Sequence, residues 1–408
     1  MARPTHKTLG LETVMGGVVL CVAFTTGGST VAQDIRFVPQ LTFEATLFAE
    51  PPQFPGQISD ATGAVIVTGD ASWRSDDRSL QFVVEPYLRY DARDDERTYA
   101  DLRRGFVRYF GDAWDVTIGA DRVFWGVVES VNVVDVINQK DALENPDLDE
   151  KLGQPMIRLA ALTGLGRFEL FYMPIFRERA FVGTESRNRL PAPVNDTAPV
   201  FDRKDGDDAD DVALRYSNTF GSVDLGLSYF QGTSRAPLLR FDAPSGTFVP
   251  RYQRQRQTGL DAQYTTGAWL WKLEATDTEI GNDHFNSAVG GLEYTFFDVG
   301  GSGRDLGLIA EYLYDSRTLG LSPATPFDDD VFLGTRITWN DVQDTELLAG
   351  VIIDRESDAA QFSVEFERRI GDSNFLEIEL RGVDAQDDPL LTAIEDDTAL
   401  TLRWSRFF

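Results

Sequence analysis

Residues 374–383, NFLEIELRGV, carry the pattern that decides the fold. Apolar and charged side chains alternate along this stretch, and that period predicts a β-strand with two unlike faces. The alternating sets are Leu376, Ile378 and Leu380 against Glu377, Glu379 and Arg381. The stretches QFSVEFERRI at 361–370 and VDLGLSYF at 223–230 repeat the pattern, so one face of the sheet meets apolar surroundings and the other meets water.

The same alternation, less strict in places, continues to the end of the chain and predicts an all-β protein. Most predicted segments are nine to fourteen residues long. Strands of soluble proteins usually stop near ~5–6 residues, whereas a tilted strand that spans a bilayer needs about 9–11. The eighteen predicted segments are 37–48, 62–74, 78–91, 98–110, 113–124, 155–163, 166–175, 210–220, 223–231, 255–266, 268–279, 285–297, 303–315, 328–339, 345–355, 359–370, 374–385 and 396–407.

The links between these segments are sorted by length. Links after even-numbered strands are mostly tight, namely 110–114, 163–166, 220–223, 265–268 and 371–374. Links after odd-numbered strands are mostly longer, namely 125–154, 176–209, 232–254, 316–327 and 386–395. Short periplasmic turns and long extracellular loops are typical of transmembrane barrels, whereas a soluble sandwich has no reason for this sorting.

The N-terminus, residues 1–32, has the order of a secretory signal peptide. A basic region precedes an apolar run at 14–24, and small residues stand ahead of Gln33. A buried N-terminal helix is the alternative. Cleavage would leave residues 33–408 as a single barrel without cysteine, because Cys21 is the one cysteine of the chain.

Charge and hydropathy exclude two classes of protein. The formal net charge of −28 argues against nucleic acid as a partner, since phosphates would be repelled. Beyond the signal, the chain has no apolar run long enough for a transmembrane helix.

The chain ends in ALTLRWSRFF, residues 399–408. This pattern resembles the closing strand of bacterial outer-membrane barrels, a signal for the barrel-assembly machinery. The matching positions are Leu400, Leu402, Trp404 and Phe408, whereas Arg406 stands where an apolar or aromatic residue is usual. The resemblance implies the outer membrane of a Gram-negative bacterium, with membrane lipid and lipopolysaccharide as neighbours.

Closure of the sheet follows from the solvent. Backbone N–H and C=O groups that face hydrocarbon find no partner there, so a spanning sheet must close into a barrel. The charged face then points at water inside. A transmembrane antiparallel β-barrel of 16–18 strands encloses an aqueous channel unless a segment blocks it.

Residues 125–154 are too apolar for an exposed loop and too irregular for one strand. Burial against the inner wall would remove their apolar surface from water, so we expect this loop to fold inward and narrow the channel. As the third long loop it resembles, in order and architecture, the constriction loop of trimeric porins. A homotrimer and a monomer both fit the sequence. FWGVVESVNVVDVIN, residues 124–138, also looks like segments of alginate-export-type barrels.

The polar side chains of this loop and of the facing wall are the candidate pore constriction. They are Glu129, Asn132, Asp135, Asn138, Asp141 and Glu144 on the loop and Arg89, Arg103, Arg104 and Arg108 on the wall. An acidic loop opposite a basic wall would set up a transverse field that orients polar solutes. Two points stay open: Arg103 and Arg104 fall on opposite faces of a regular strand, and the arginines could instead pair with acidic neighbours in the wall.

The sequence predicts no enzyme, no metal site and no cofactor. A barrel hydrolase needs a histidine base, and His284, with Ser287 three residues later, is the one histidine beyond the signal. Barrel phospholipases carry His and Ser two apart, followed by Asn-Gly, and both features are missing here. The acidic runs at 145–150, 204–211 and 326–330 lack the spacing of a calcium loop.

These features together favour a porin-like channel for diffusion of small hydrophilic solutes, with a mild cation preference from the net charge. Two alternatives belong to other classes. One is the barrel of a dedicated export system, for example for an acidic polysaccharide, which an arginine-lined lumen would favour. The other is a structural or surface-binding barrel with a filled interior.

Overall fold

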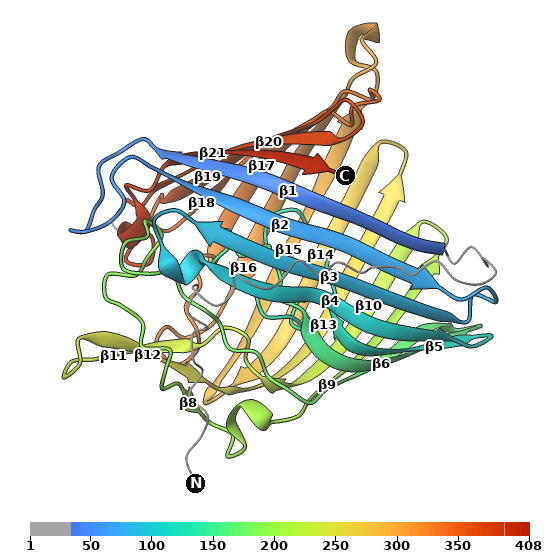
Figure 1. The fold of residues 1–408 in the computed structure, drawn as a ribbon, viewed down its shortest axis with the longest axis horizontal. Coiled ribbons are helices and arrows are strands. Elements are labelled where there is room, and N and C mark those ends of the chain that lie inside the picture. The colour runs from blue at the N-terminus through green and yellow to red at the C-terminus, as the bar shows by residue number, and fades with distance from the viewer. Residues whose placement is uncertain (1–33, 387) are drawn as a thin grey trace, which may run out of the picture. The chain divides into compact units, whose positions relative to one another are not determined.

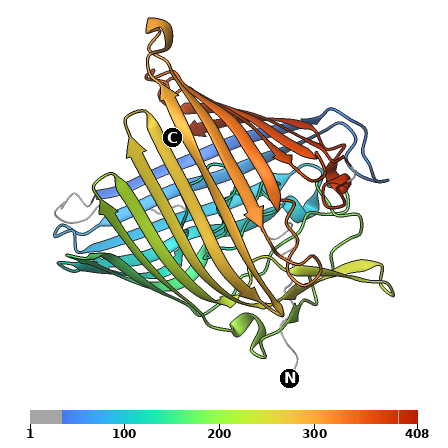
Figure 2. The ribbon, with the colours of Figure 1, turned by 180° about the vertical axis from the view of Figure 1, so that it is seen from behind.

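The computed structural model of this chain describes residues 34–386 and 388–408. The predicted signal peptide, residues 1–32, lies outside the described residues. Figures 1 and 2 show long strands that run side by side around one sheet.

Eighteen strands of the described chain form this sheet. They are β1 (Asp34–Phe48), β2 (Ala61–Arg74), β3 (Leu80–Asp91), β4 (Tyr99–Phe110), β5 (Trp114–Asp121), β6 (Gln154–Thr163), β7 (Gly166–Met173), β9 (Asp211–Phe220), β10 (Val223–Thr233), β13 (Arg254–Thr266), β14 (Trp269–Ile280), β15 (Asp283–Phe296), β16 (Asp305–Asp315), β17 (Asp329–Thr338), β18 (Glu346–Asp354), β19 (Ala360–Ile370), β20 (Asn374–Asp384) and β21 (Ala399–Phe407). A small second sheet contains β8 (Val200–Phe201), β11 (Leu238–Asp242) and β12 (Thr247–Tyr252), and the 3-10 turns are η1 (Asp95–Arg97), η2 (Gly206–Asp208), η3 (Val299–Gly301) and η4 (Thr392–Ile394).

The first and last strands close the sheet into a barrel. β1 pairs antiparallel with both β2 and β21, and its register to β21 runs from Gln40 opposite Phe407 to Phe48 opposite Ala399. Side chains support the seam, because the hydroxyls of Thr42 and Ser405 lie 2.7 Å apart. Each barrel strand therefore has two neighbours, and the prediction of a closed antiparallel barrel of 16–18 strands is confirmed.

The predicted strands correspond one to one with the barrel strands, with differences at some ends. The segment predicted at 113–124 ends at Asp121, because the chain turns inward there. The segment predicted at 396–407 begins at Ala399, after the turn that follows η4. The small sheet of β8, β11 and β12 was not predicted, because its strands have two to six residues and alternate weakly.

The two faces of each strand meet different surroundings, as β3 shows. Its outward side chains are exposed, namely Phe82 (40%), Val84 (46%), Leu88 (51%) and Tyr90 (55%). The inward side chains between them are Val83 (4%), Tyr87 (4%) and Arg89 (2%). A belt of exposed apolar side chains around a closed sheet is the surface that lipid requires.

An irregularity in β4 changes which side chains face the lumen. Glu85 of β3 pairs with Arg104, but the next residue, Pro86, pairs with Leu102, so Arg103 is the extra residue of a β-bulge. The bulge resolves the open register of the sequence. Three arginines of β4 have partners on the lumenal side, namely Arg103, Arg104 and Arg108.

The connections are sorted by barrel end as predicted. Tight turns such as 111–113 and 371–373 lie at one end, and the longest connections, 122–153 and 174–210, lie at the other. Within the described residues, no helix is long and apolar enough to cross a membrane.

Arg187 connects the loops at the end of the barrel that carries the long connections. Its fully buried guanidinium pairs with Asp397 (Nε–Oδ1 2.8 Å) and donates to the carbonyl oxygens of Glu50 and Asp396. Loop 174–210 therefore reaches around the rim to the loops that flank β1 and β21.

Replacing Arg187 by alanine is expected to release loop 174–210. Asp397 would lose its buried partner, which typically costs about 3–5 kcal/mol. We expect faster proteolysis within residues 178–195 of the folded protein. Arg189→Ala is the matched control, because the Arg189 guanidinium donates to the nearby carbonyls of Leu190 and Pro191 and contacts the β1–β2 loop through the Phe54 ring (4.4 Å), without a buried ion pair among the described residues. Equal cleavage of the two variants would contradict this role for Arg187.

Candidate functional site

The candidate site is the segment between β5 and β6, residues 122–153, which we call the inward loop. Its neck is held by Asn138, which accepts the Val123 N–H (2.9 Å) and donates to the carbonyls of Asp121 and Leu152 (2.9 Å each). Asp135 pairs with Lys140 and Lys151. Asp135 and Asn138 therefore stabilise the loop itself, and the proposed constriction has to rest on other side chains.

One side of the loop packs on the lumenal faces of β6, β7, β9 and β10. Trp125 is 2% exposed and meets Phe171 of β7 edge to face, with ring centroids 5.7 Å apart. The apolar cluster contains Val123, Trp125, Val134, Val136, Ile137, Met156, Phe171, Met173, Ala213 and Phe230. Burial of these residues explains why the segment is too apolar for a loop in water.

The tip of the loop packs on the lumenal faces of β15–β18, further around the barrel. Val128 is buried with Val289, Ile309, Leu313 and Phe332, and these side chains belong to β15, β16 and β17. The Glu129 carboxylate pairs with Arg336 (2.7 Å) and with Lys272 (3.5 Å). The loop thus crosses the lumen from β5 to β17.

Asn132 also lies at the tip. Its Oδ1 is buried and accepts no hydrogen bond from the described residues.

A second arm of the loop, residues 140–150, packs on β4 and reaches β20. Arg103 of the bulge donates to the carboxylates of Asp141 and Glu144, both at 2.6 Å, and its guanidinium lies 4.1 Å from the Tyr87 ring centroid. Asp147 pairs with Arg381 of β20. Desolvation by burial, reinforced by nearby Glu150, raises the pKa of Glu144 to about 7 although Arg103 opposes the shift.

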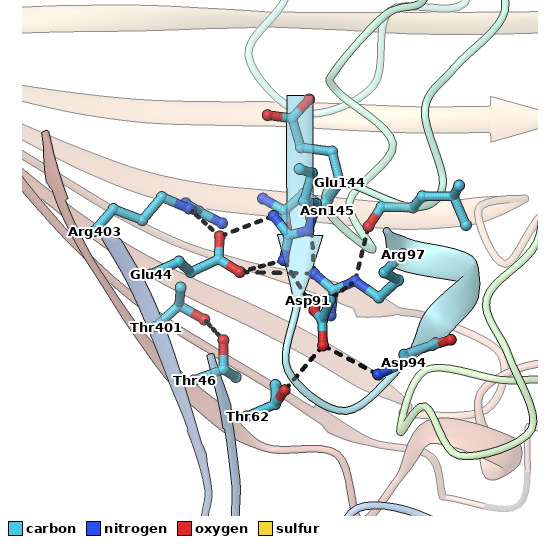
Figure 3. Close-up of polar contacts among 12 residues, drawn as sticks. Glu44, Thr46, Thr62, Asp91, Asp94, Arg97, Glu144, Asn145, Thr401 and Arg403 are labelled. Atoms are coloured by element: carbon cyan, nitrogen blue, oxygen red, sulfur yellow. Dashed lines mark hydrogen bonds and ion pairs between the residues drawn. The ribbon is translucent and has the colours of Figure 1, made fainter. Parts of the chain in front are cut away.

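Arg89 belongs to a charged cluster of the wall, and Figure 3 labels its neighbours Glu44, Asp91, Arg97 and Arg403. Its partner is Glu44 of β1 (2.5 Å), which also pairs with Arg403 of β21 (2.8 Å) and Arg97 of η1 (3.7 Å). Arg97 in turn donates to the Leu143 carbonyl (2.9 Å) of the inward loop. The cluster therefore braces the barrel seam, and within the described residues it contacts the loop directly through Arg97 and indirectly through Glu379, which pairs with Arg403 and accepts a hydrogen bond from Asn145.

Arg104 and Arg108 pair within the wall. Arg104 binds Glu85 (2.6 Å) and Asp70 (2.9 Å), and Arg108 binds Asp121 (3.4 Å). Among the four predicted arginines, Arg103 makes the ion pairs with the loop, and the other three follow the alternative of pairing with acidic neighbours in the wall.

Open space lies beside β1–β4. A cavity of about 630 Å³ is lined by polar residues of these strands and of the loop, among them Arg36, Gln40, Asp70, Glu85, Arg104 and Arg122. The two sides of the lumen therefore differ in polarity: the loop fills an apolar part, and a polar part beside β1–β4 stays open.

Solved structures with a similar fold include Pseudomonas aeruginosa OccK11 (OpdR), with a TM-score of 0.53 and 11% identity over 92% of this chain and 96% of that chain. A BenF-like porin from Pseudomonas fluorescens Pf-5 gives 0.53 and 9% over 93% and 100%, and Acinetobacter baumannii OccAB3 gives 0.51 and 11% over 91% and 99%. The chain has the fold of the outer-membrane porins. No protein-family model and no curated protein sequence matches the chain.

This porin fold belongs to the outer membrane of Gram-negative bacteria. Its closing strand carries the predicted assembly signal: Trp404 stacks on Phe43 of β1 at 5.9 Å, Leu400 and Leu402 pair with Leu47 and Ala45, and Phe408 is 66% exposed. Recognition of these residues by the assembly machinery remains a prediction.

His284 and Ser287 cannot act together, because they lie on opposite faces of β15. His284 is exposed and bonds Asp277 (2.8 Å), whereas the buried Ser287 donates to Asp315. In residues 34–386 and 388–408, no group of three or more His, Cys, Asp or Glu side chains has the geometry of a metal site.

Several residues that contact the loop or brace the seam are not among the predicted site residues, namely Glu44, Arg97, Lys272, Glu274, Glu311, Arg336 and Arg403. Most are charged residues at inward positions of predicted strands. Alternation gives that face, but it does not give the partner across the lumen.

Proposed function

We propose that the protein is a channel for diffusion of small hydrophilic solutes, and that the path runs along the lumenal faces of β1–β4 and β18–β21. The proposal is supported by the difference in polarity between the two sides of the lumen. The inward loop covers apolar lumenal side chains of β6, β7, β9, β10, β15, β16 and β17 and, on β18, Leu348 and Ile352. Polar and charged side chains stand at many inward positions of the strands along the proposed path.

The observation that carries the proposal is this polar wall. It includes Gln40, Thr46, Thr68, Asp70, Glu85, Ser363, Glu365, Glu377, Thr401 and Arg403, at inward positions of their strands. Charged groups are stable in a barrel only when they are paired or hydrated. A row of such groups beside open space supports a water-filled path.

The experiment that tests the function is swelling of proteoliposomes in isotonic solutions of small sugars and amino acids. We expect swelling rates that fall with solute size, and none with heat-denatured protein. Absence of swelling by correctly folded protein would reject the channel and favour the filled barrel, to which the dense packing of the inward loop also points.

We further propose a mild cation preference. Glu346, Glu367 and Glu377 occupy successive register positions on β18, β19 and β20, and Glu365 lies opposite Glu379. Three arginines pair within this group, namely Arg336, Arg381 and Arg403. The five carboxylates outnumber them, so the potential along this wall favours cations.

Replacing Glu365, Glu367 and Glu377 by glutamine is expected to lower the cation-to-anion permeability ratio about twofold or more. The measurement is the reversal potential in a potassium chloride gradient. The control carries the same charge change in the exposed loop at Asp205, Asp207 and Asp208, replaced by asparagine. An equal fall of the cation-to-anion permeability ratio in both variants would show that the selectivity does not come from the glutamates of β19 and β20.

A further inference from the structure

Two wall carboxylates hold the tip of the inward loop by its backbone. Glu274 of β14 accepts the N–H groups of Val127 (2.7 Å) and Val128 (3.2 Å) on Oε1 and that of Val134 (3.2 Å) on Oε2. The carboxylate is therefore shared between the two ends of the same turn.

Glu311 of β16 continues the arrangement. Its Oε1 accepts the Glu129 N–H (2.8 Å), and its Oε2 accepts the N–H (2.8 Å) and the hydroxyl (2.7 Å) of Ser130. Four consecutive N–H groups, from 127 to 130, thus point at two carboxylates.

Both carboxylates are buried in the described structure, with Glu274 at 0% and Glu311 at 3% exposure. Lys272 on the same strand as Glu274 pairs with Glu129 and Glu293 instead. Burying a carboxylate costs free energy unless its oxygens accept hydrogen bonds. The loop amides therefore stabilise Glu274 and Glu311 in the wall, and the same hydrogen bonds hold the loop in place.

Two glycines make room for these contacts. Gly126 has φ +146°, and a Cβ there would lie 2.9 Å from Glu274 Oε1 and 2.0 Å from Asn132 Oδ1. A Cβ on Gly291 of β15 would lie 2.6 Å from Glu311 Cγ. Side chains at either position would push a carboxylate off the loop backbone.

We propose that Glu274 and Glu311 are the positioning residues of the pore: they latch residues 127–134 to the far wall and so set the width of the path. This inference rests on the proposed channel function. Apolar packing of Val128 and its neighbours gives affinity for the wall but little directionality, whereas six hydrogen bonds from one turn define a single position.

Glutamine is the sharpest substitution because it keeps the shape of the side chain. Its NH2 group replaces one acceptor oxygen by a donor, which then faces a backbone N–H. Glu274→Gln should disturb the amides of 127, 128 and 134, and Glu311→Gln those of 129 and 130. Glu293→Gln is the matched control, because Glu293 is a buried lumenal carboxylate of β15, between the two strands, and its carboxylate lies beside Lys272 (4.0 Å) and accepts no hydrogen bond from the backbone of residues 127–134 in the described structure.

The test is amide hydrogen exchange of the folded protein, resolved by overlapping peptides, together with single-channel recording. Each single variant is expected to speed exchange at its own amides about tenfold or more, and the double variant to raise conductance about 1.5-fold or more with added current noise. Glu293→Gln should leave exchange at 127–134 unchanged. Heat-modifiable mobility in gels checks folding, and the single variants decide the question if the double variant does not fold.

Unchanged amide exchange at residues 127–134 in both single variants would show that Glu274 and Glu311 do not hold the loop. Faster exchange at unchanged conductance would overturn their role in setting the pore. If the wild-type protein carries no current at all, the channel proposal fails, and the exchange data still show whether the carboxylates hold the loop.

Discussion

Replacing residues 124–151 by two glycines is expected to raise single-channel conductance about threefold or more. Two glycines can span the gap between Val123 and Leu152, because both residues bond the Asn138 side chain in the native neck and therefore lie close together. The loop crosses the lumen to β17 and β20, so its removal opens the whole interior to water. Planar-bilayer recording of single insertions is the measurement.

A control removes a loop of a different region. Residues 239–250 make up most of the β11–β12 hairpin, and Leu238 pairs directly with Arg251, so two glycines can close the gap that their removal leaves. We expect that variant to keep wild-type conductance. If both deletions change conductance alike, or if the first changes nothing, the inward loop does not restrict the path.

Replacing Arg103 by alanine is expected to free the second arm of the inward loop. Asp141 and Glu144 would both lose the Arg103 guanidinium, with which each forms an ion pair. Removal of one member of a buried ion pair typically costs about 3–5 kcal/mol. We expect amide exchange in residues 140–150 to become at least about tenfold faster while the barrel strands keep their protection. The pore should also become wider and noisier.

Arg104→Ala is the comparison that makes this result specific. The two arginines are adjacent and both face the lumen, but the Arg104 side chain is 33% exposed and its partners, Glu85 and Asp70, belong to the wall. Its ion pairs are hydrated, so their loss should cost under about 1 kcal/mol and leave the loop protected. Equal exchange in the two variants would show that Arg103 does not hold the arm.

Most of the barrel could be predicted from local patterns. Alternation in β20 and β21 and the sorting of turns by length depend only on nearby residues, because the two faces of a strand meet two different solvents. The closing pair of β1 and β21 follows from the need to leave no edge in lipid.

The partners of the inward loop could not be predicted, for two physical reasons. Glu274 and Glu311 bind amides 140 to 182 residues away in sequence, and nothing local marks such a pair. The bulge at Arg103 adds one residue to β4 and reverses the faces that strict alternation predicts. For these reasons strict alternation cannot place both Arg103 and Arg104 in the lumen, and Arg89, which is predicted to face the loop, pairs with Glu44 instead.

Cysteine accessibility tests most directly whether water fills the proposed path along the lumenal faces of β1–β4 and β18–β21. Cys21 is the native cysteine, and it lies in the predicted signal. Single cysteines at Thr68, Ser363 and Thr401 are expected to react with a charged, membrane-impermeant thiol reagent and to lose current, whereas cysteines at Ala213 (0% exposed) and Val289 (1%) should be inert. Equal reactivity of the two sets, or no reaction at the first three positions, would contradict the account.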